Sequence, residues 1–200
     1  VIPAVEINTA ANDKELHILG YFVDIDNSVL KERLRAIRGA RLDRAEKIVK
    51  RLQNIGVPLR MEQVLAVSAG DSVGRPHIAR ALAAMGACRS ETEAFERYLK
   101  AGCPAYVPRY RLSPLDAISA IRAAGGLAVV AHPVLLHDDR LILELQRQGL
   151  SGVEAYHCEH SPSVARYYLE FARRHGLLVT GGSDSHGPLS HRPVAIGAVM

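Results

Sequence analysis

The stretch LLVTGGSDSHG, residues 177–187, decides the fold prediction for this chain. The apolar run 177–180 has the composition of a buried strand, and it is followed by glycines that flank Asp184 and His186. In parallel α/β folds, the chemistry lies just past the carboxyl ends of the strands. An aspartate and a histidine at such a strand end are either a plain turn or two ligands of one ion.

Similar apolar runs recur along the chain, with helical patterns between most of them. The predicted strands cover residues 4–7, 16–23, 127–131, 153–156 and 177–180. Ser113-Pro114 and Ser161-Pro162 each supply an N-cap followed by a proline in the first turn. The first of these helices stops at Gly125-Gly126 and the second at Gly176. This alternation predicts α/β units around a parallel sheet.

The middle of the chain, from about Ser28 to about Lys100, contains no good strand candidate. Apolar residues at three-to-four spacing predict a long amphipathic helix, interrupted at Gly39, and further helices follow at 61–69, 75–85 and 91–101. We therefore predict an α/β domain in two pieces, residues 1–27 and 113–200, with an all-helical insert at residues 28–112.

The long helix is rich in basic side chains, which has two readings. It is either a solvated face or an electrostatic surface for a polyanion. The basic residues are Lys31, Arg33, Arg35, Arg38, Arg41, Arg44, Lys47, Lys50 and Arg51.

The composition is that of a globular protein of the cell interior. Apolar residues make up 48% of the 200 residues and charged residues 23%, with a net charge of +4. No run of ~18 apolar residues is present, so we expect no membrane association. The three scattered cysteines fit free thiols in a reducing cytoplasm.

Nearly every predicted strand delivers a histidine or a carboxylate to the same rim of the sheet. These residues are Glu6, His17, His132, His157, His160, Asp184 and His186. Each alone has an ordinary interpretation as a turn residue or a core histidine. Together, mixed imidazole and carboxylate ligands suit Mn, Fe or Zn. Two such ions ~3.5–4 Å apart can clamp a phosphoryl group and activate a water.

These residues resemble the PHP (polymerase and histidinol phosphatase) family of metal-dependent phosphoesterases. The likeness is carried by VEI at 5–7, ELHILGY at 15–21, AHP at 131–133 and GSDSH at 182–186. The resemblance implies a distorted (β/α)₇ barrel with a trinuclear metal site at the carboxyl rim. It implies that Glu6 bridges two metals, that His17 and His132 ligate one of them and Asp184 the other, and that His186 holds the third. Glu6, Asp184 and His186 are thereby the expected catalytic residues.

Within this family, the chain is similar to the branch of nucleoside 3′,5′-bisphosphate phosphatases and 5′-to-3′ exoribonucleases acting on short RNA. The similar stretches are GRPHIARAL at 74–82, PAYVPR at 104–109 and GVEAYH at 152–157. Arg75 and His77 flank a proline at a predicted helix start, where amides and the helix dipole favour an anion. Arg109 offers a bidentate fork to another phosphate. With His157 and His160 as weaker candidates, these residues are expected to bind the non-reacting phosphate.

The chain departs from the family in lacking the Asp-x-His-x-His motif of the first strand. We therefore expect an N-terminally incomplete barrel, a partial metal site and a longer reading frame. The expected cofactors are two or three divalent ions, with Mn²⁺ as the expected metal, and the expected partner is a nucleotide or short RNA, with no obligate protein partner. The alternatives are a small-metabolite phosphatase, such as a histidinol phosphatase, and a non-catalytic nucleic-acid-binding domain with a degenerate metal site.

Overall fold

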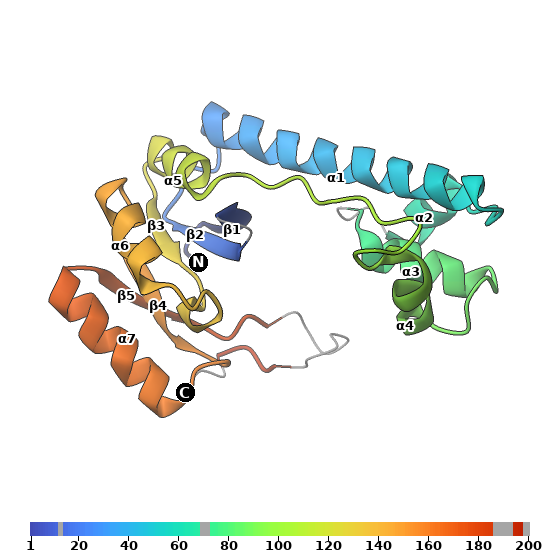
Figure 1. The fold of residues 1–200 in the computed structure, drawn as a ribbon. Coiled ribbons are helices and arrows are strands. Elements are labelled where there is room, and N and C mark those ends of the chain that lie inside the picture. Colours follow the sequence, from blue (N-terminus) through green and yellow to red (C-terminus); the bar gives the residue numbers. More distant parts are fainter. Residues whose placement is uncertain (12–13, 69–72, 186–193, 198–200) are drawn as a thin grey trace. The chain divides into compact units, whose positions relative to one another are not determined.

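The computed structural model describes residues 1–11, 14–68, 73–185 and 194–197 (Figure 1). The chain forms two compact units. The first unit combines residues 1–32 and 111–200, and the second unit is residues 33–110.

The first unit contains a five-stranded mixed sheet in the order β1-β2-β3-β4-β5. The strands are β1 (Ala4–Ala11), β2 (Lys14–Tyr21), β3 (Leu127–Val130), β4 (Gly152–His157) and β5 (Leu178–Gly182). β3, β4 and β5 are parallel, whereas β1, β2 and β3 pair antiparallel. The prediction of a parallel sheet is therefore wrong for the first two strands. Only two residues separate β1 from β2, and a parallel crossover needs a dozen or more.

The α/β class is confirmed, and the sheet among the described residues is open rather than closed into a barrel. Helix α5 (Pro114–Ala123) packs on β1, β2 and β3, and α7 (Pro162–His175) packs on β4 and β5. Gly20 on β2 permits this close approach, because a Cβ there would lie 2.8 Å from Ile121 Cγ1 on α5. The two helices together thus contact all five strands.

The predicted helix starts are confirmed by their capping bonds. The Ser113 hydroxyl accepts the Asp116 N–H at 3.1 Å, and the Ser161 hydroxyl accepts the Val164 N–H at 3.3 Å. Helix α7 ends at Gly176, whose φ of 67° is the left-handed conformation that glycine adopts readily. The sequence analysis missed α6 (Asp139–Arg147) and the short 3₁₀ turn Pro133–Leu135, although Asp138 caps α6 in the same way.

Helices are the regular elements of the second unit among its described residues, and turns and loops connect them. Helix α1 (Ser28–Asn54) leads into it and is followed by α2 (Met61–Ser68), α3 (Arg75–Ala84) and α4 (Glu91–Ala94), which continues as a π-helix at Phe95–Leu99. The core of this unit gathers large aliphatic side chains from these helices. Among them are Ile48, Leu52, Leu59, Val64, Ile78, Leu82 and Leu99.

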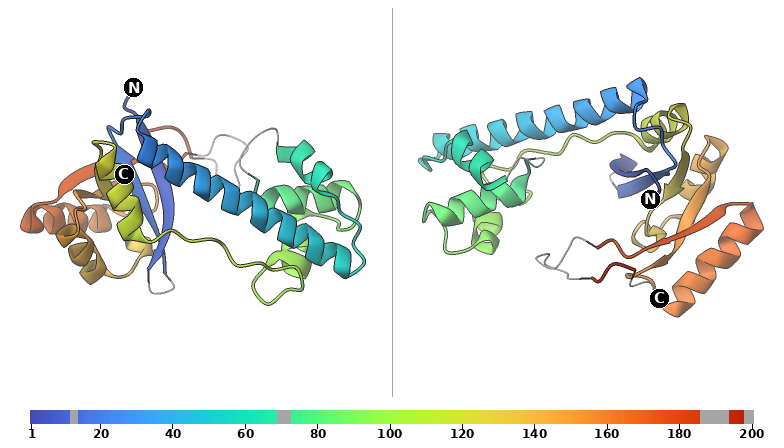
Figure 2. Two further views of the ribbon diagram at one scale, coloured as in Figure 1. Left: turned by 90° about the horizontal axis from the view of Figure 1, so that it is seen from above. Right: turned by 180° about the vertical axis from the view of Figure 1, so that it is seen from behind.

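Helix α1 differs from its prediction in two ways. It runs without interruption through Gly39, as all views show (Figures 1 and 2), since one glycine costs a helix only about 1 kcal/mol. Its apolar face is buried in the second unit only from Ala45 onward. Most of its basic side chains are exposed, but Arg44 donates to the Val107 carbonyl at 2.8 Å and Arg51 donates to the Tyr106 carbonyl. None of the described helices is both long and apolar enough to cross a lipid bilayer.

Candidate metal centre

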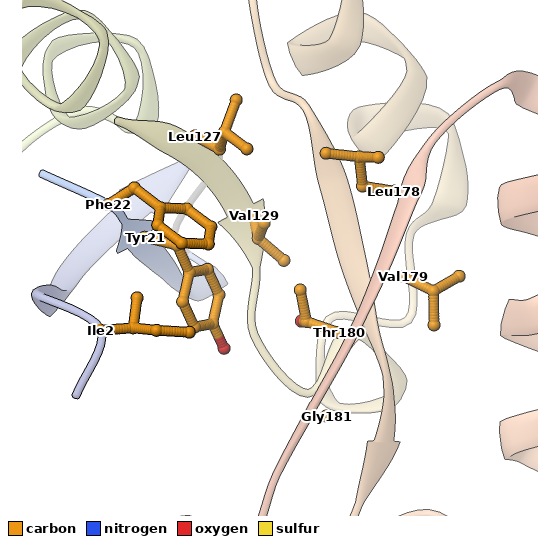
Figure 3. A pocket seen from close by; sticks show the side chains of 9 residues that line it. All are labelled: Ile2, Tyr21, Phe22, Leu127, Val129, Leu178, Val179, Thr180 and Gly181. Atoms are coloured by element: carbon orange, nitrogen blue, oxygen red, sulfur yellow. The ribbon is translucent and has the colours of Figure 1, made fainter. Parts of the chain in front are cut away.

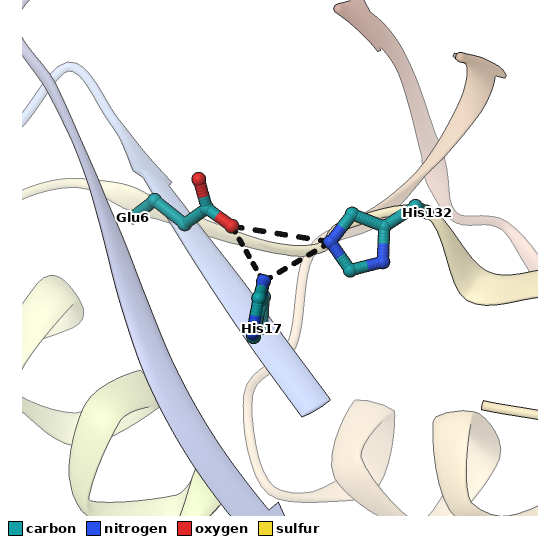
Figure 4. A group of neighbouring side chains, drawn as sticks. All are labelled: Glu6, His17 and His132. Carbon is teal, nitrogen blue, oxygen red and sulfur yellow. Dashed lines mark hydrogen bonds and ion pairs between the residues drawn. The ribbon is translucent and has the colours of Figure 1, made fainter. Parts of the chain in front are cut away.

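Three ligand-bearing side chains from three segments meet at one face of the sheet. They are Glu6 on β1, His17 on β2 and His132 just after β3, and one ligand atom of each lies within 4.8 Å of the others (Figure 4). Glu6 Oε1 is 2.7 Å from His17 Nδ1 and 3.9 Å from His132 Nε2. The two imidazole nitrogens are 3.1 Å apart.

The strand register explains this meeting. Asn8 on β1 is the direct partner of His17, and Glu6 lies two residues before Asn8, on the same face of its strand. Glu6 and His17 are thus diagonal neighbours across an antiparallel pair. On the other side of β2, the Ala131 N–H donates to the His17 carbonyl at 3.0 Å, which brings the next residue, His132, close to His17.

The backbone of His132 is held in an uncommon conformation. Its φ is 29° and its ψ 58°, which costs a non-glycine residue on the order of 1–3 kcal/mol. Its N–H donates to Glu154 Oε2 at 2.8 Å, and Pro133 begins the 3₁₀ turn that follows. This carboxylate contact fixes the point at which the chain leaves β3 and turns the imidazole toward His17.

The donor set fits a divalent ion. Ligand atoms that share one ion at bonds of about 2.1 Å lie roughly 3.0–3.4 Å apart, and the three distances here bracket that range. His17 presents Nδ1 to the cluster, while its Nε2 lies 3.4 Å from Glu15 Oε1. A carboxylate on the second ring nitrogen is the usual support of a metal-binding histidine, because it fixes the ring and its tautomer.

The cluster is electrostatically coupled. The neighbouring imidazoles of His132 and His17 hold the pKa of Glu6 far below its usual range and outweigh the effect of burial. Burial lowers the pKa of His17, but hydrogen bonds to Glu6 and Glu15 and their charges outweigh it and raise the pKa. Glu6 is therefore ionised at any physiological pH, as a metal ligand must be.

A cavity of about 170 Å³ adjoins the cluster and gathers further titratable side chains. It is lined by Glu6, Leu19, Tyr21, Ala131, His132, Glu154, His157, Gly182 and Asp184. Asp184 thus lies in the same cavity, but it is not one of the three converging ligands. The expected ligand His186 lies outside the described residues.

Glu154 on β4 is a site residue that the sequence analysis missed. It is 4% exposed, and burial raises its pKa to about 7, with the Glu6 and Asp184 charges adding to the shift against the His132 contact. A Cβ on Gly182 would lie 2.8 Å from Glu154 Oε1, so the second glycine of the opening stretch makes room for this carboxyl group. An acid in an otherwise apolar strand was the available signal.

His157 and His160 belong to the first unit as well. Both are buried, at 1% and 0% exposed, and His157 lines the cavity. Their rings are 5.7 Å apart, and the ring of His157 is 5.3 Å from that of His132. His160 stacks on Tyr168, with the ring centres 5.6 Å apart.

The other expected phosphate-binding residues, Arg75, His77 and Arg109, lie in the second unit. Arg75 donates to the Leu99 carbonyl at 3.1 Å and its guanidinium lies 5.7 Å from the centre of the Phe95 ring. His77 Nδ1 accepts the Gly74 N–H at 3.1 Å, which leaves Nε2 as the N–H of the neutral ring. Arg109 is exposed.

Basic side chains crowd together in the second unit. Burial, and after it the positive charge of Arg109, lowers the pKa of Arg41. The pKa of Arg44 is lowered by burial and then by Arg75 and Arg109. The positive charge of Arg109 thus acts on both Arg41 and Arg44, and that of Arg75 acts on Arg44.

A larger, apolar cavity of about 280 Å³ also opens in the first unit, and aliphatic and aromatic side chains surround it (Figure 3). Its lining is Ile2, Tyr21, Phe22, Leu127, Val129, Leu178, Val179, Thr180 and Gly181. Because the lining contains no carboxylate or imidazole, the metal chemistry belongs to the smaller cavity.

Comparison with known proteins identifies relatives of this chain. No family model matches the chain. It is 33% identical over 193 residues to the 5′-3′ exoribonuclease Rnm of Escherichia coli, covering 94% of this chain and 66% of the relative. It is also 33% identical over 192 residues to the 3′,5′-nucleoside bisphosphate phosphatase of Chromobacterium violaceum, covering 92% of this chain and 67% of the relative. The chain thus spans about two thirds of the length of these relatives.

A solved structure has the same fold as this chain. A structure from Bifidobacterium adolescentis, described as a metal-dependent phosphoesterase, superposes with a TM-score of 0.80 at 33% identity, covering all of this chain and 72% of the other. The chain belongs to the PHP family of metal-dependent phosphoesterases. Its named relatives within that family are an exoribonuclease and a bisphosphate phosphatase.

Proposed function

We propose that the protein removes the 3′-phosphate from nucleoside 3′,5′-bisphosphates and also degrades short RNA from its 5′ end, acting in the cytoplasm without an obligate protein partner. The observation that carries this proposal is the convergence of Glu6, His17 and His132 beside a cavity with two further carboxyl groups. The relatives with these activities support the choice of substrate.

The proposed metal ligands divide into two groups. Glu6, His17 and His132 hold one ion, and Asp184 and His186 serve a second or third. Mn²⁺ is our choice among Mn, Fe and Zn, which share these ligands. When bound, such ions neutralise the phosphoryl oxygens and lower the pKa of a water so that it attacks phosphorus at neutral pH.

The surrounding side chains keep this ligand set in order. Glu15 orients His17 through its Nε2, and Glu154 fixes the backbone of His132. Apolar strand residues beside the cavity, such as Leu19 and Ala131, exclude bulk water on that side, which strengthens the electrostatic interactions inside.

The second unit supplies the proposed anion site for the non-reacting phosphate. Arg75 is positioned by Leu99 and Phe95, and His77 has an Nε2–H to donate. Arg109 adds a third positive or donor group from a loop. A bisphosphate or an RNA 5′ end carries the second anionic group that such a site would bind.

The test is phosphate release from adenosine 3′,5′-bisphosphate by the intact protein with Mn²⁺. We expect release that chelation abolishes, with the 5′-monophosphate as the nucleoside product. A 5′-labelled RNA of a few nucleotides should yield mononucleotides from its labelled end. Asp184→Asn should lose turnover while it keeps the thermal melting temperature of the wild type.

Two outcomes would contradict the proposal. One is release of the 5′-phosphate, which would leave the 3′-monophosphate as product. The other is near-normal turnover by Asp184→Asn, which would remove Asp184 from the metal site.

A further inference from the structure

One ring nitrogen of His157 accepts a hydrogen bond, and the other has no hydrogen-bond partner among the described residues. The Glu159 N–H donates to His157 Nδ1 at 3.1 Å, so Nδ1 carries a lone pair. In the neutral ring the proton therefore sits on Nε2. Nε2 is fully buried, and among the described residues it has no hydrogen-bond partner.

Two other imidazoles lie beside this ring. The ring centre of His157 is 5.3 Å from that of His132 and 5.7 Å from that of His160, and neither ring accepts a hydrogen bond from Nε2. A buried N–H without an acceptor costs about 1–3 kcal/mol, so such a group calls for a ligand or another explanation.

His160 provides a contrast from the same segment. Its Nδ1 lies 2.8 Å from the Ala155 carbonyl, which only accepts, so Nδ1 carries the proton and Nε2 the lone pair. Donation to a backbone carbonyl is the pattern of a metal-binding histidine. His157 has the opposite tautomer: its Nε2 carries a proton, whereas a metal ligand needs a lone pair there. Of the two histidines, only His157 is among the residues that line the cavity.

We infer that the Nε2–H of His157 donates a hydrogen bond to an oxygen of the phosphoryl group that binds in the cavity. Its neighbours there are the acceptor-rich side chains Glu6, Glu154 and Asp184, which need cations before an anion can enter. Phosphoryl oxygens only accept, so they match this donor. The inference deepens the proposed function, on which it rests for the chemistry of the ligand, and it excludes His157 from the metal ligands.

The test is the affinity of the Mn²⁺-loaded intact protein for inorganic phosphate, measured by calorimetry. His157→Asn keeps an acceptor near the position of Nδ1 for the Glu159 N–H, but it has no donor at the position of Nε2. His157→Gln retains a donor near that position. We expect phosphate affinity to fall about tenfold in His157→Asn and no more than about threefold in His157→Gln, with bound Mn²⁺ unchanged in both.

His175→Asn is the matched control. His175 is a histidine of α7 in the same unit and does not line the cavity, so phosphate affinity should stay as in the wild type. A second measurement needs no variant. In wild-type protein loaded with Zn²⁺, phosphate should move the His157 Nε2–H proton resonance downfield.

Several results would overturn the inference: no phosphate binding by the loaded wild type, wild-type affinity in His157→Asn, an unmoved Nε2–H resonance, or loss of bound metal in His157→Asn. Weaker phosphate binding in His157→Asn with normal metal content supports it. That result would stand even if the wild type did not hydrolyse nucleoside bisphosphates, which separates this inference from the proposed function.

Discussion

Glu15 should control metal affinity without touching the metal. Its carboxylate lies 3.4 Å from His17 Nε2, on the ring nitrogen opposite the one that faces Glu6. It keeps the proton on Nε2 and the lone pair on Nδ1, and it makes the imidazole a better ligand. Replacing Glu15 by alanine removes both the hydrogen bond and the charge.

The expected loss of Mn²⁺ affinity follows from how exposed the Glu15–His17 pair is. Loss of such a supporting carboxylate generally costs 10–100-fold in metal affinity. The Glu15 side chain is 53% exposed, and at this distance a charge pair in water contributes only about 1 kcal/mol. The low end of the 10–100-fold range therefore applies, and we expect about tenfold weaker Mn²⁺ binding in Glu15→Ala. Glu15→Gln keeps an acceptor without the charge and should lose about threefold.

The assay is a calorimetric Mn²⁺ titration of the chelator-treated protein, with thermal melting as the check of folding. Glu144→Ala is the matched control, because it removes an exposed carboxylate from α6 in the same unit. Wild-type affinity in Glu15→Ala would refute the reasoning. Equal losses in Glu15→Ala and Glu144→Ala would also refute it, because they would show a general effect of net charge.

Three further predictions concern stability and substrate binding. Because burial raises the pKa of Glu154 to about 7, the folded metal-free protein retains a proton that the unfolded chain has released. Urea titrations should therefore show the free energy of unfolding falling by about 2.5 kcal/mol between pH 5 and 8. Glu154→Gln should flatten that fall, and a stability that rises with pH over this range would contradict it. Gly20→Ala should lower the melting temperature by about 2–10 °C, since its Cβ meets Ile121, whereas Gly39→Ala, with open space around it, should not lower it. His77→Ala should raise KM for a bisphosphate more than for a monophosphate; equal increases would remove His77 from the anion site.

The sequence predicted the elements of the fold better than their arrangement. Strands with apolar runs and helices with serine-proline starts are local features, and the five strands and both capped helices were found near their predicted positions. The direction of β1 and β2 was not, because pairing depends on partners that are distant in the sequence. Helix α6 was missed although Asp138 caps it, and the break expected at Gly39 did not occur.

For the site, the sequence by itself determined the inventory of groups: acids and imidazoles next to apolar strands, in the order that the PHP family shows. Only the tertiary structure decided which of them meet. The antiparallel register makes Glu6 and His17 diagonal neighbours, and the turn after β3 brings His132 to them. The tertiary structure also placed Glu154 in the site, where Gly182 leaves room for it. It assigned opposite tautomers to His157 and His160. Residue type sets which chemistry is available, whereas distances, burial and backbone partners set protonation and ligand geometry, and those arise only when separate segments pack together.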